Sequence, residues 1–251
     1  MRTKKEQQDK SHWLPFIGDF LLEHLRNDGR IDIRDGQYPE SNLYLSGAIF
    51  PLLVSYERTN RKEYLFGVRK ILDYFLQTQT DEGGWTLGYL EAGGESTVAM
   101  GGYGSFSELS HKVSTCSPGW LLSAVRKYET LTSDVQYRVM VTKAIAFLDN
   151  SWNCRWGFDD GFLRGMFKEG INLVGLWNWR NDFPAAQKLV TNSIECITTN
   201  PRWWNETDRF WYDNVGGQGG SGATTNLLMA CAIMESTTGQ FLASHVIPVI
   251  D

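Results

Sequence analysis

The stretch that decides the fold of this chain reads Lys70-Ile-Leu-Asp-Tyr-Phe-Leu-Gln-Thr-Gln-Thr-Asp-Glu-Gly-Gly-Trp85. Tyr74, Phe75 and Leu76 close an amphipathic helical pattern, and Gly83-Gly84 follows them. Glycine reaches left-handed backbone angles that end a helix without a clash of Cβ. The stretch therefore predicts an outer helix that ends before an aromatic plug, Trp85.

Helices of two kinds alternate on both sides of this stretch. Segments that are apolar nearly all round predict inner helices, and amphipathic segments predict outer ones. Ser117-Pro118 and Ser133-Asp134 are predicted to cap two of these helices, because Ser and Asp accept hydrogen bonds at helix starts and Pro fits the first turn. The predicted helices span 11–28, 43–57, 61–79, 118–130, 133–150, 169–180, 182–198 and 225–235.

The hairpin turns of this pattern resemble one another, as at Tyr56-Glu57-Arg58-Thr59 and Tyr128-Glu129-Thr130-Leu131. A repeat of this kind is typical of an array of helical hairpins. We therefore predict an all-α fold, in which about four hairpins form an α/α toroid and the first helix covers the last. The whole chain, 1–251, is predicted to be a single domain, with residues 1–10 as a flexible tail.

The pattern Lys-x-x-x-x-Phe-x-x-x-Gln-x-x-x-Gly-x-Trp in this stretch resembles the QW repeat of squalene-type and other class II terpene cyclases. The family pattern has glycine where this chain has Ile71. The resemblance implies that Gln79 and Trp85 hold one hairpin to the next in a toroid. The Gln-x-x-x-Gly-Gly-Trp core also resembles a segment of toroidal polysaccharide lyases. Asp35-Gly-Gln-Tyr-Pro-Glu-Ser41 likewise resembles a stretch of heparinase-like lyases.

Composition and charge exclude several classes of function. A net charge of −5 and a pI of about 5.5 argue against a general nucleic-acid binder. No stretch is long and apolar enough for stable membrane insertion, and Met1–Lys10 lacks the apolar run of a secretory signal. We therefore expect a cytoplasmic protein; the sequence leaves its oligomeric state open.

The four cysteines, at positions 116, 154, 196 and 231, are far apart and have no histidine pair nearby. Without the spacing of metal ligands, no structural zinc is expected. We expect these cysteines to be reduced, mostly buried thiols, and we expect no metal and no cofactor.

The connections that lead from outer to inner helices should meet at one mouth of the toroid, where the inner helices present unpaired backbone N–H groups. Aromatic, acidic and basic residues gather in these connections. Any one of them is more simply explained by packing or by an exposed loop, but the whole set favours a site. The candidate substrate-binding residues are Tyr38, Tyr89, Glu95, Trp156, Phe158, Arg164, Trp211, Tyr212 and Asn214.

Three functions fit this mouth. As a carbohydrate-active enzyme on an acidic or uronic-acid-containing glycan, the protein would use His111 and Tyr103 for proton transfer in a lyase. A glycoside hydrolase would instead use two carboxylates, from the candidates Asp159, Asp160, Asp213 and Glu95.

The second function is a terpene-cyclase-like enzyme with an isoprenoid in an aromatic-lined cavity. The chain lacks the Asp-x-Asp-Asp run that starts that reaction in the family, because Asp159-Asp160 is only a fragment of it. The third is a noncatalytic binding or scaffold toroid. The expected partner is therefore an oligosaccharide, an isoprenoid or another small molecule.

Overall fold

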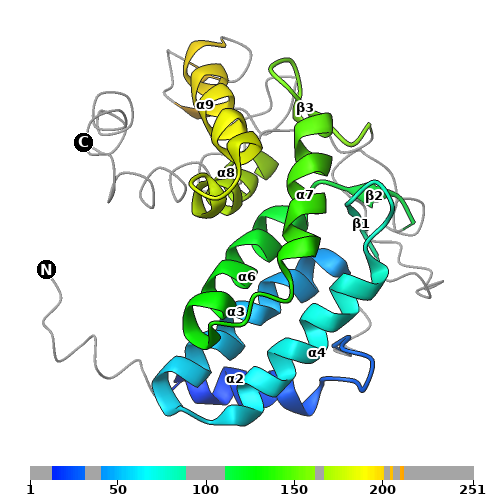
Figure 1. The fold of residues 1–251 in the computed structure, drawn as a ribbon, viewed down its shortest axis with the longest axis vertical. Helices are drawn as coiled ribbons and strands as arrows, with labels where there is room; N and C mark the ends of the chain where they lie inside the picture. The colour runs from blue at the N-terminus through cyan, green and yellow to red at the C-terminus, as the bar shows by residue number, and fades with distance from the viewer. Residues whose placement is uncertain are drawn as a thin grey trace, which may run out of the picture.

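The structure is a computed structural model that describes residues 13–31, 41–88, 111–161, 167–200, 204–205 and 210–211 (Figure 1). These residues form seven α-helices and three short antiparallel hairpins, so the prediction of a largely all-α fold is confirmed. The helices are α2 (Trp13–Glu23), α3 (Asn42–Thr59), α4 (Lys62–Thr78), α6 (Pro118–Thr132), α7 (Arg138–Ser151), α8 (Phe167–Trp179) and α9 (Pro184–Thr199). The hairpins pair β1 (Trp85–Thr86) with β2 (Val113–Ser114), β3 (Trp152–Asn153) with β4 (Gly157–Phe158), and β5 (Trp204–Asn205) with β6 (Phe210–Trp211).

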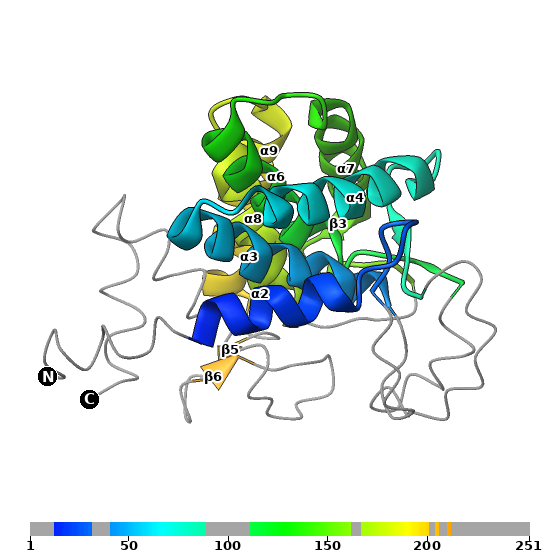
Figure 2. The same ribbon diagram turned by 90° about the horizontal axis from the view of Figure 1, so that it is seen from below.

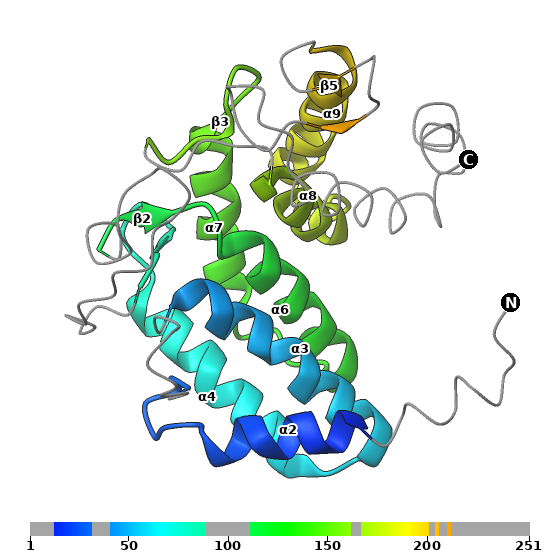
Figure 3. The same cartoon turned by 180° about the vertical axis from the view of Figure 1, so that it is seen from behind.

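The helices lie in two layers. α6 contacts both α3 and α8, while α4, α7 and α9 pack on α3, α6 and α8 respectively (Figures 1 and 3). α2 lies along α3 (Figure 2). Because each outer helix returns the chain, the three inner helices run in the same direction and begin at the same end of the molecule.

The inner helices are held closely together at two glycines. A Cβ atom on Gly119 would lie 2.5 Å from the carbonyl oxygen of Ile171, and one on Gly175 would lie 2.6 Å from the carbonyl oxygen of Gly119. Any larger residue at either position would force α6 and α8 apart. Pro51 lies inside α3, and the helix continues through it.

Gln79 connects two neighbouring hairpins, and Trp85 anchors the chain that leaves α4 against that helix. The Gln79 amide donates to the carbonyl oxygens of Gly83 (2.8 Å) and Met140 (3.0 Å), which joins the end of α4 to α7. Trp85 is completely buried, and its indole N–H donates to the carbonyl oxygen of Phe75 at 2.7 Å. Gly83 has φ +95°, and a Cβ there would lie 2.2 Å from the Lys143 carbonyl oxygen. Glycine is thus required at this turn.

One of the two predicted serine caps is at the predicted position, and the other is wrong. Ser117 is the N-cap residue of α6 and Pro118 lies in the first turn, but the Ser117 side chain makes no capping bond. Ser133 adopts φ +60° and ends α6, so it lies at the C-terminus of one helix instead of the start of the next. Asp134 accepts from the amide of Gln136 in a turn, and α7 begins only at Arg138.

The expectation of reduced cysteines is wrong for one pair. Cys154, in the β3–β4 turn, forms a disulfide with Cys196 of α9. Their Cα atoms are 5.6 Å apart, within the usual range for a disulfide. Cys116 is a buried free thiol, as expected, and Cys231 lies outside the described residues.

The predicted helix at 225–235 also lies outside the described residues, so the structure leaves closure of the toroid untested. Among the helices that are described, none is long and apolar enough to cross a membrane.

Candidate functional site

The site is built at the end of the molecule where α3, α6 and α8 begin. The first two hairpins of strands lie in connections from an outer to an inner helix, so they belong to this end; the third follows the outer helix α9. The first is attached to α3 directly, because Asn42 donates to the carbonyl oxygens of Thr86 and Gly88 at 2.8 and 3.1 Å. Apart from Trp211 in β6, the predicted residues that the structure describes lie in the first two hairpins and the turns beside them.

A buried ion pair joins the first two connections. Lys168, in the first turn of α8, donates to Asp160 Oδ2 at 3.1 Å, and both side chains are 1% exposed. The same oxygen accepts from the Thr115 amide at 3.1 Å and from the hydroxyls of Ser114 and Thr115 at 3.2 Å. These contacts tie the segment before α6 to the start of α8. Burial at this place also raises the pKa of the Cys116 thiol to about 11, so Cys116 stays protonated at neutral pH.

Glu169, next to Lys168, is a second buried acid. It is 1% exposed and accepts from the Phe158 amide at 2.9 Å through Oε1. Burial raises the pKa of Glu169 to about 8, although that amide and the charge of Lys168 oppose the shift. The glycine at 157 has φ +70° and makes room for the carboxyl group, since a Cβ there would lie 2.1 Å from Oε1. Glu169 is therefore mostly protonated at neutral pH and holds β4 against α8.

Two buried polar atoms near the starts of α6 and α8, Ser117 Oγ and Asn172 Oδ1, have no hydrogen-bond partner among the described residues. The Ser193 hydroxyl of α9 lies against the Glu169 carboxyl group and also opposes the rise of its pKa. Asn172 also donates to the Thr115 carbonyl oxygen at 2.9 Å, which adds a link between α8 and the segment before α6. Unpartnered buried polar atoms are costly, so their concentration here sets this end of the helices apart from the apolar core.

The β3–β4 turn presents a cation on an aromatic ring. The Asn153 side chain accepts from the amides of Arg155 and Trp156 at 3.1 and 2.9 Å, which shapes the turn. The Arg155 guanidinium lies 4.8 Å from the centre of the Trp156 ring. Arg155 is exposed and Trp156 is half-buried. We call Arg155 and Trp156 the tip of the hairpin.

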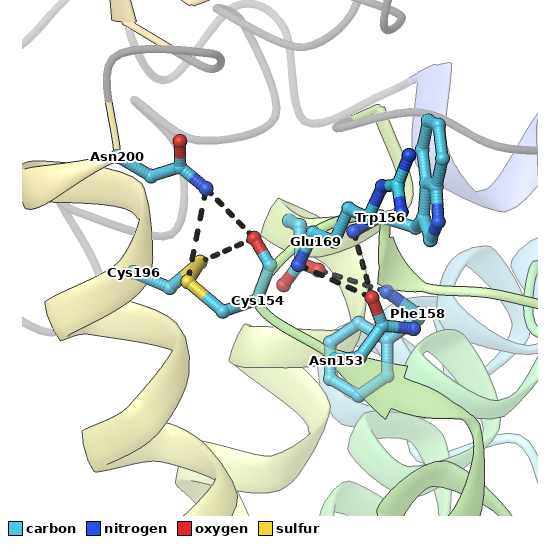
Figure 4. The surroundings of a disulfide bond; sticks show 8 residues. Asn153, Cys154, Trp156, Phe158, Glu169, Cys196 and Asn200 are labelled. Carbon is cyan, nitrogen blue, oxygen red and sulfur yellow. Dashed lines mark hydrogen bonds between the residues drawn. A yellow bond between two sulfur atoms is a disulfide. The ribbon is translucent and has the colours of Figure 1, made fainter.

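The tip is fixed to α9 by two contacts that Figure 4 shows. The first is the disulfide between Cys154 and Cys196. In the second, the Asn200 side chain donates to the Cys154 carbonyl oxygen at 2.8 Å. At the other end of the hairpin, the bond from Phe158 to Glu169 holds the base.

The predicted site residues have different surroundings. His111 is exposed where the described chain resumes before β2. Asp159 is half-buried, and its Oδ1 accepts from the Gly161 amide at 2.8 Å. Asp160 lies in the buried ion pair. Phe158 is completely buried, so its ring belongs to the core and offers no face to a ligand here.

The other predicted residues lie outside what the structure describes, so their predicted roles stay predictions. Trp211 is described only as part of β6, where it is opposite Trp204. The residues outside the described ranges are Tyr38, Tyr89, Glu95, Tyr103, Arg164, Tyr212, Asp213 and Asn214.

Sequence reasoning missed Glu169 and Lys168 as members of this end of the molecule. An acidic residue in the first turn of a helix is ordinarily explained by its favourable interaction with the helix dipole. A lysine next to it is ordinarily explained as an exposed surface side chain. The available signal was that both charges open a helix that is otherwise almost entirely apolar.

Within the described ranges, no three side chains of His, Cys, Asp and Glu lie close enough together to hold a metal ion. A search against protein families matches none of them, and no curated protein is similar enough to count as a relative. The function is therefore argued from the site alone.

Proposed function

We propose that this protein is a carbohydrate-active enzyme, a polysaccharide lyase or glycoside hydrolase, that acts on an acidic or uronic-acid-containing glycan. The observation that carries the proposal is the hairpin tip, where Arg155 lies over the ring of Trp156. An indole face packs against the C–H groups of a sugar ring, and a guanidinium donates paired hydrogen bonds to a carboxylate. The two groups together match a uronic-acid unit.

The tip is prepared for binding before any ligand arrives. The Asn153 bonds shape its backbone, and the disulfide holds it to α9. Ordering a loop on binding costs free energy, so a turn that is already ordered binds its ligand more tightly.

The chemistry of the proposed enzyme follows one of two routes. In β-elimination, His111 and Tyr103 remove the proton at C5 of the uronic acid and protonate the leaving oxygen. In hydrolysis, Asp159 and Asp213 share the roles of acid and base. We assign Asp160 a structural role, because its carboxylate is buried against Lys168 and three donors from Ser114 and Thr115.

We also propose that the helical array closes as an α/α toroid of about four hairpins. The contacts of α6 with both α3 and α8 support this, and the apolar segment 225–235 would supply a fourth inner helix. The active centre would then lie at the mouth where the inner helices begin.

The experiment is a panel of acidic and neutral polysaccharides. A lyase product carries a double bond conjugated to the carboxylate and absorbs in the ultraviolet, whereas a hydrolase releases reducing ends without that absorbance. We expect turnover of an acidic glycan and little turnover of its neutral counterpart. In Arg155→Gln, activity on the acidic glycan should fall about tenfold or more, as removal of a charged hydrogen-bonding partner predicts. Absence of both signals on every acidic glycan would refute the proposal.

A second candidate is a terpene-cyclase-like enzyme. The observation in its favour is an edge-on contact between Phe50 of α3 and Trp120 of α6, with ring centres 5.7 Å apart. Aromatic faces from neighbouring inner helices would stabilise a carbocation. Saturable binding of an isoprenoid diphosphate, with no binding of acidic glycans, would favour this candidate. A third candidate, a noncatalytic glycan-binding toroid, would bind acidic glycans without turning them over.

A further inference from the structure

We propose that the Cys154–Cys196 disulfide is a thiol-controlled clamp that holds the hairpin tip in its binding position and releases it on reduction. The two cysteines differ in a way that suits such a device. Cys154 is exposed in the turn, while Cys196 is 5% exposed on α9. A dissolved thiol can therefore reach the disulfide from the side of Cys154.

The disulfide lies at the tip of the β3–β4 hairpin and not at its base, so its reduction would affect the position of the tip. At the base, Phe158 is bonded to Glu169, and the Asp159 amide donates to the Ser151 carbonyl oxygen at 2.9 Å. Neither contact involves sulfur. Beside the tip, the disulfide is the covalent attachment to α9, and the half-buried Asn200 adds a hydrogen bond to the Cys154 carbonyl oxygen. Reduction therefore loosens the tip and leaves the base of the hairpin and the helical core in place.

The reaction is an ordinary thiol–disulfide exchange with a dithiol. One thiolate of the dithiol attacks Cys154 Sγ, and Cys196 leaves as a thiolate and takes up a proton. The second thiol of the dithiol then displaces Cys154, so that the dithiol is oxidised to a cyclic disulfide. Two electrons pass to the protein, which gains two thiols.

The consequence for the tip concerns both its backbone and its side chains. Arg155 follows Cys154 directly, so reduction removes the covalent tie to α9 from the backbone that places the guanidinium over Trp156, while the Asn153 bonds remain. The peptide bond after Arg155 is also a substrate for trypsin, and proteolysis requires a locally open backbone. Trypsin thus reports on the clamp without any knowledge of the ligand.

The experiment treats the native full chain with dithiothreitol, blocks the new thiols with iodoacetamide, and follows trypsin cleavage by mass spectrometry. Mass spectrometry should show that two cysteines, Cys154 and Cys196, become alkylated without denaturant. Cleavage after Arg155 should then accelerate about tenfold or more, as for a segment that changes from clamped to locally open. Cleavage after Arg138, in α7, should stay unchanged, since general unfolding would accelerate both.

Two variants serve as controls. Cys154→Ser combined with Cys196→Ala should be cleaved rapidly after Arg155 with or without dithiothreitol. Cys116→Ala removes the buried free thiol and should respond to the reductant as the unaltered protein does. Either of two results would overturn the proposal: a disulfide that resists dithiothreitol until the protein is unfolded, or verified reduction that leaves cleavage after Arg155 unchanged.

A further arm rests on the proposed function. Reduction should weaken binding of a uronic-acid oligosaccharide about tenfold, because an unclamped tip must be ordered on binding. If trypsin detects the clamp but no acidic glycan binds in either redox state, the proposed function fails while the clamp stands. If the glycan binds equally well in both states, the tip is not part of the binding site.

Discussion

Glu169→Gln is expected to make the protein more stable at alkaline pH, an unusual result for a substitution in a buried site. Glutamine has the same shape as the protonated acid and keeps an oxygen that accepts from the Phe158 amide. What it removes is the ability of this position to become charged. The substitution therefore isolates the free energy of ionising a carboxyl group that is 1% exposed.

The size of the effect follows from the pKa of Glu169, which burial raises from 4.5 to about 8. The folded protein thus binds more protons than the unfolded chain between these two values. Stability from the protonated acid is complete below pH 4.5 and is lost as the pH rises to about 8. At about 1.36 kcal/mol for each pH unit, the loss amounts to at most roughly 5 kcal/mol.

Urea denaturation, followed by circular dichroism from pH 5 to 9, measures this loss. At pH 5 the two proteins should differ in unfolding free energy by about 1 kcal/mol or less, because both carry a neutral group. At pH 9 the variant should be more stable by several kcal/mol, up to the limit of about 5. Parallel curves for the two proteins across this range would refute the assignment of Glu169 as a buried neutral acid.

Glu129→Gln is the matched control. Glu129 is also buried, at 7% exposure, but it is paired with Arg138 at 3.1 Å and with Arg126 at 3.8 Å. Removing its charge should lower stability at neutral pH, because the two guanidinium groups lose the buried carboxylate that they share and keep only their contacts with Asp182 among the ion pairs of the described residues. The two substitutions, chemically identical, should therefore have opposite signs at pH 9.

Three further outcomes are expected. Asp160→Asn should destabilise the protein by about 3–5 kcal/mol in urea denaturation, because it removes the charge that compensates the buried Lys168; a loss below about 1 kcal/mol would mean that the ion pair is exposed in solution. Trp85→Ala should cost about 3–5 kcal/mol, whereas unchanged stability with lost ligand binding would place Trp85 in the site. Amide hydrogen exchange should be slower in α3, α6 and α8 than in α4, α7 and α9, and the reverse order would contradict the two-layer arrangement.

Much of the fold could be predicted because burial leaves a periodic trace in the sequence. Ile49, Leu52 and Leu53 recur at helical spacing and are completely buried in α3. Gly83 could be placed at the end of a helix because a left-handed turn requires glycine. Trp85 could be placed in the core because an indole fills a large space there. These features depend on neighbours in the sequence.

The features that were missed depend on partners far apart in the sequence. The disulfide joins cysteines 42 positions apart, and no spacing rule indicates which cysteines meet. The sequence marks Asp160 as a candidate catalytic acid, but its pairing with Lys168 follows only from the packing of α6 on α8, which buries both side chains. Ser133 was assigned to the wrong helix because serine rarely adopts φ +60°, which is the conformation that ends α6.

The sequence could predict where in the fold the candidate site lies, but not which side chains form it. Outer-to-inner connections meet at one end for topological reasons, and the sequence places Trp156 and Asp159 there. Exposure then separates residues that the sequence could not distinguish. Phe158 points into the core, while Trp156, two positions earlier, stands half-exposed beside Arg155.

Isothermal titration calorimetry of a uronic-acid oligosaccharide against the native protein, Trp156→Ala and Phe66→Ala tests the central claim most directly. Phe66 is a matched control, because it is a 63% exposed aromatic residue on the outer helix α4. If the hairpin tip binds the glycan, Trp156→Ala should weaken binding about 10- to 100-fold, the range expected for an aromatic anchor of an interface. Phe66→Ala should bind as the native protein does. Equal affinities for all three proteins would contradict the claim that the glycan binds at the β3–β4 hairpin.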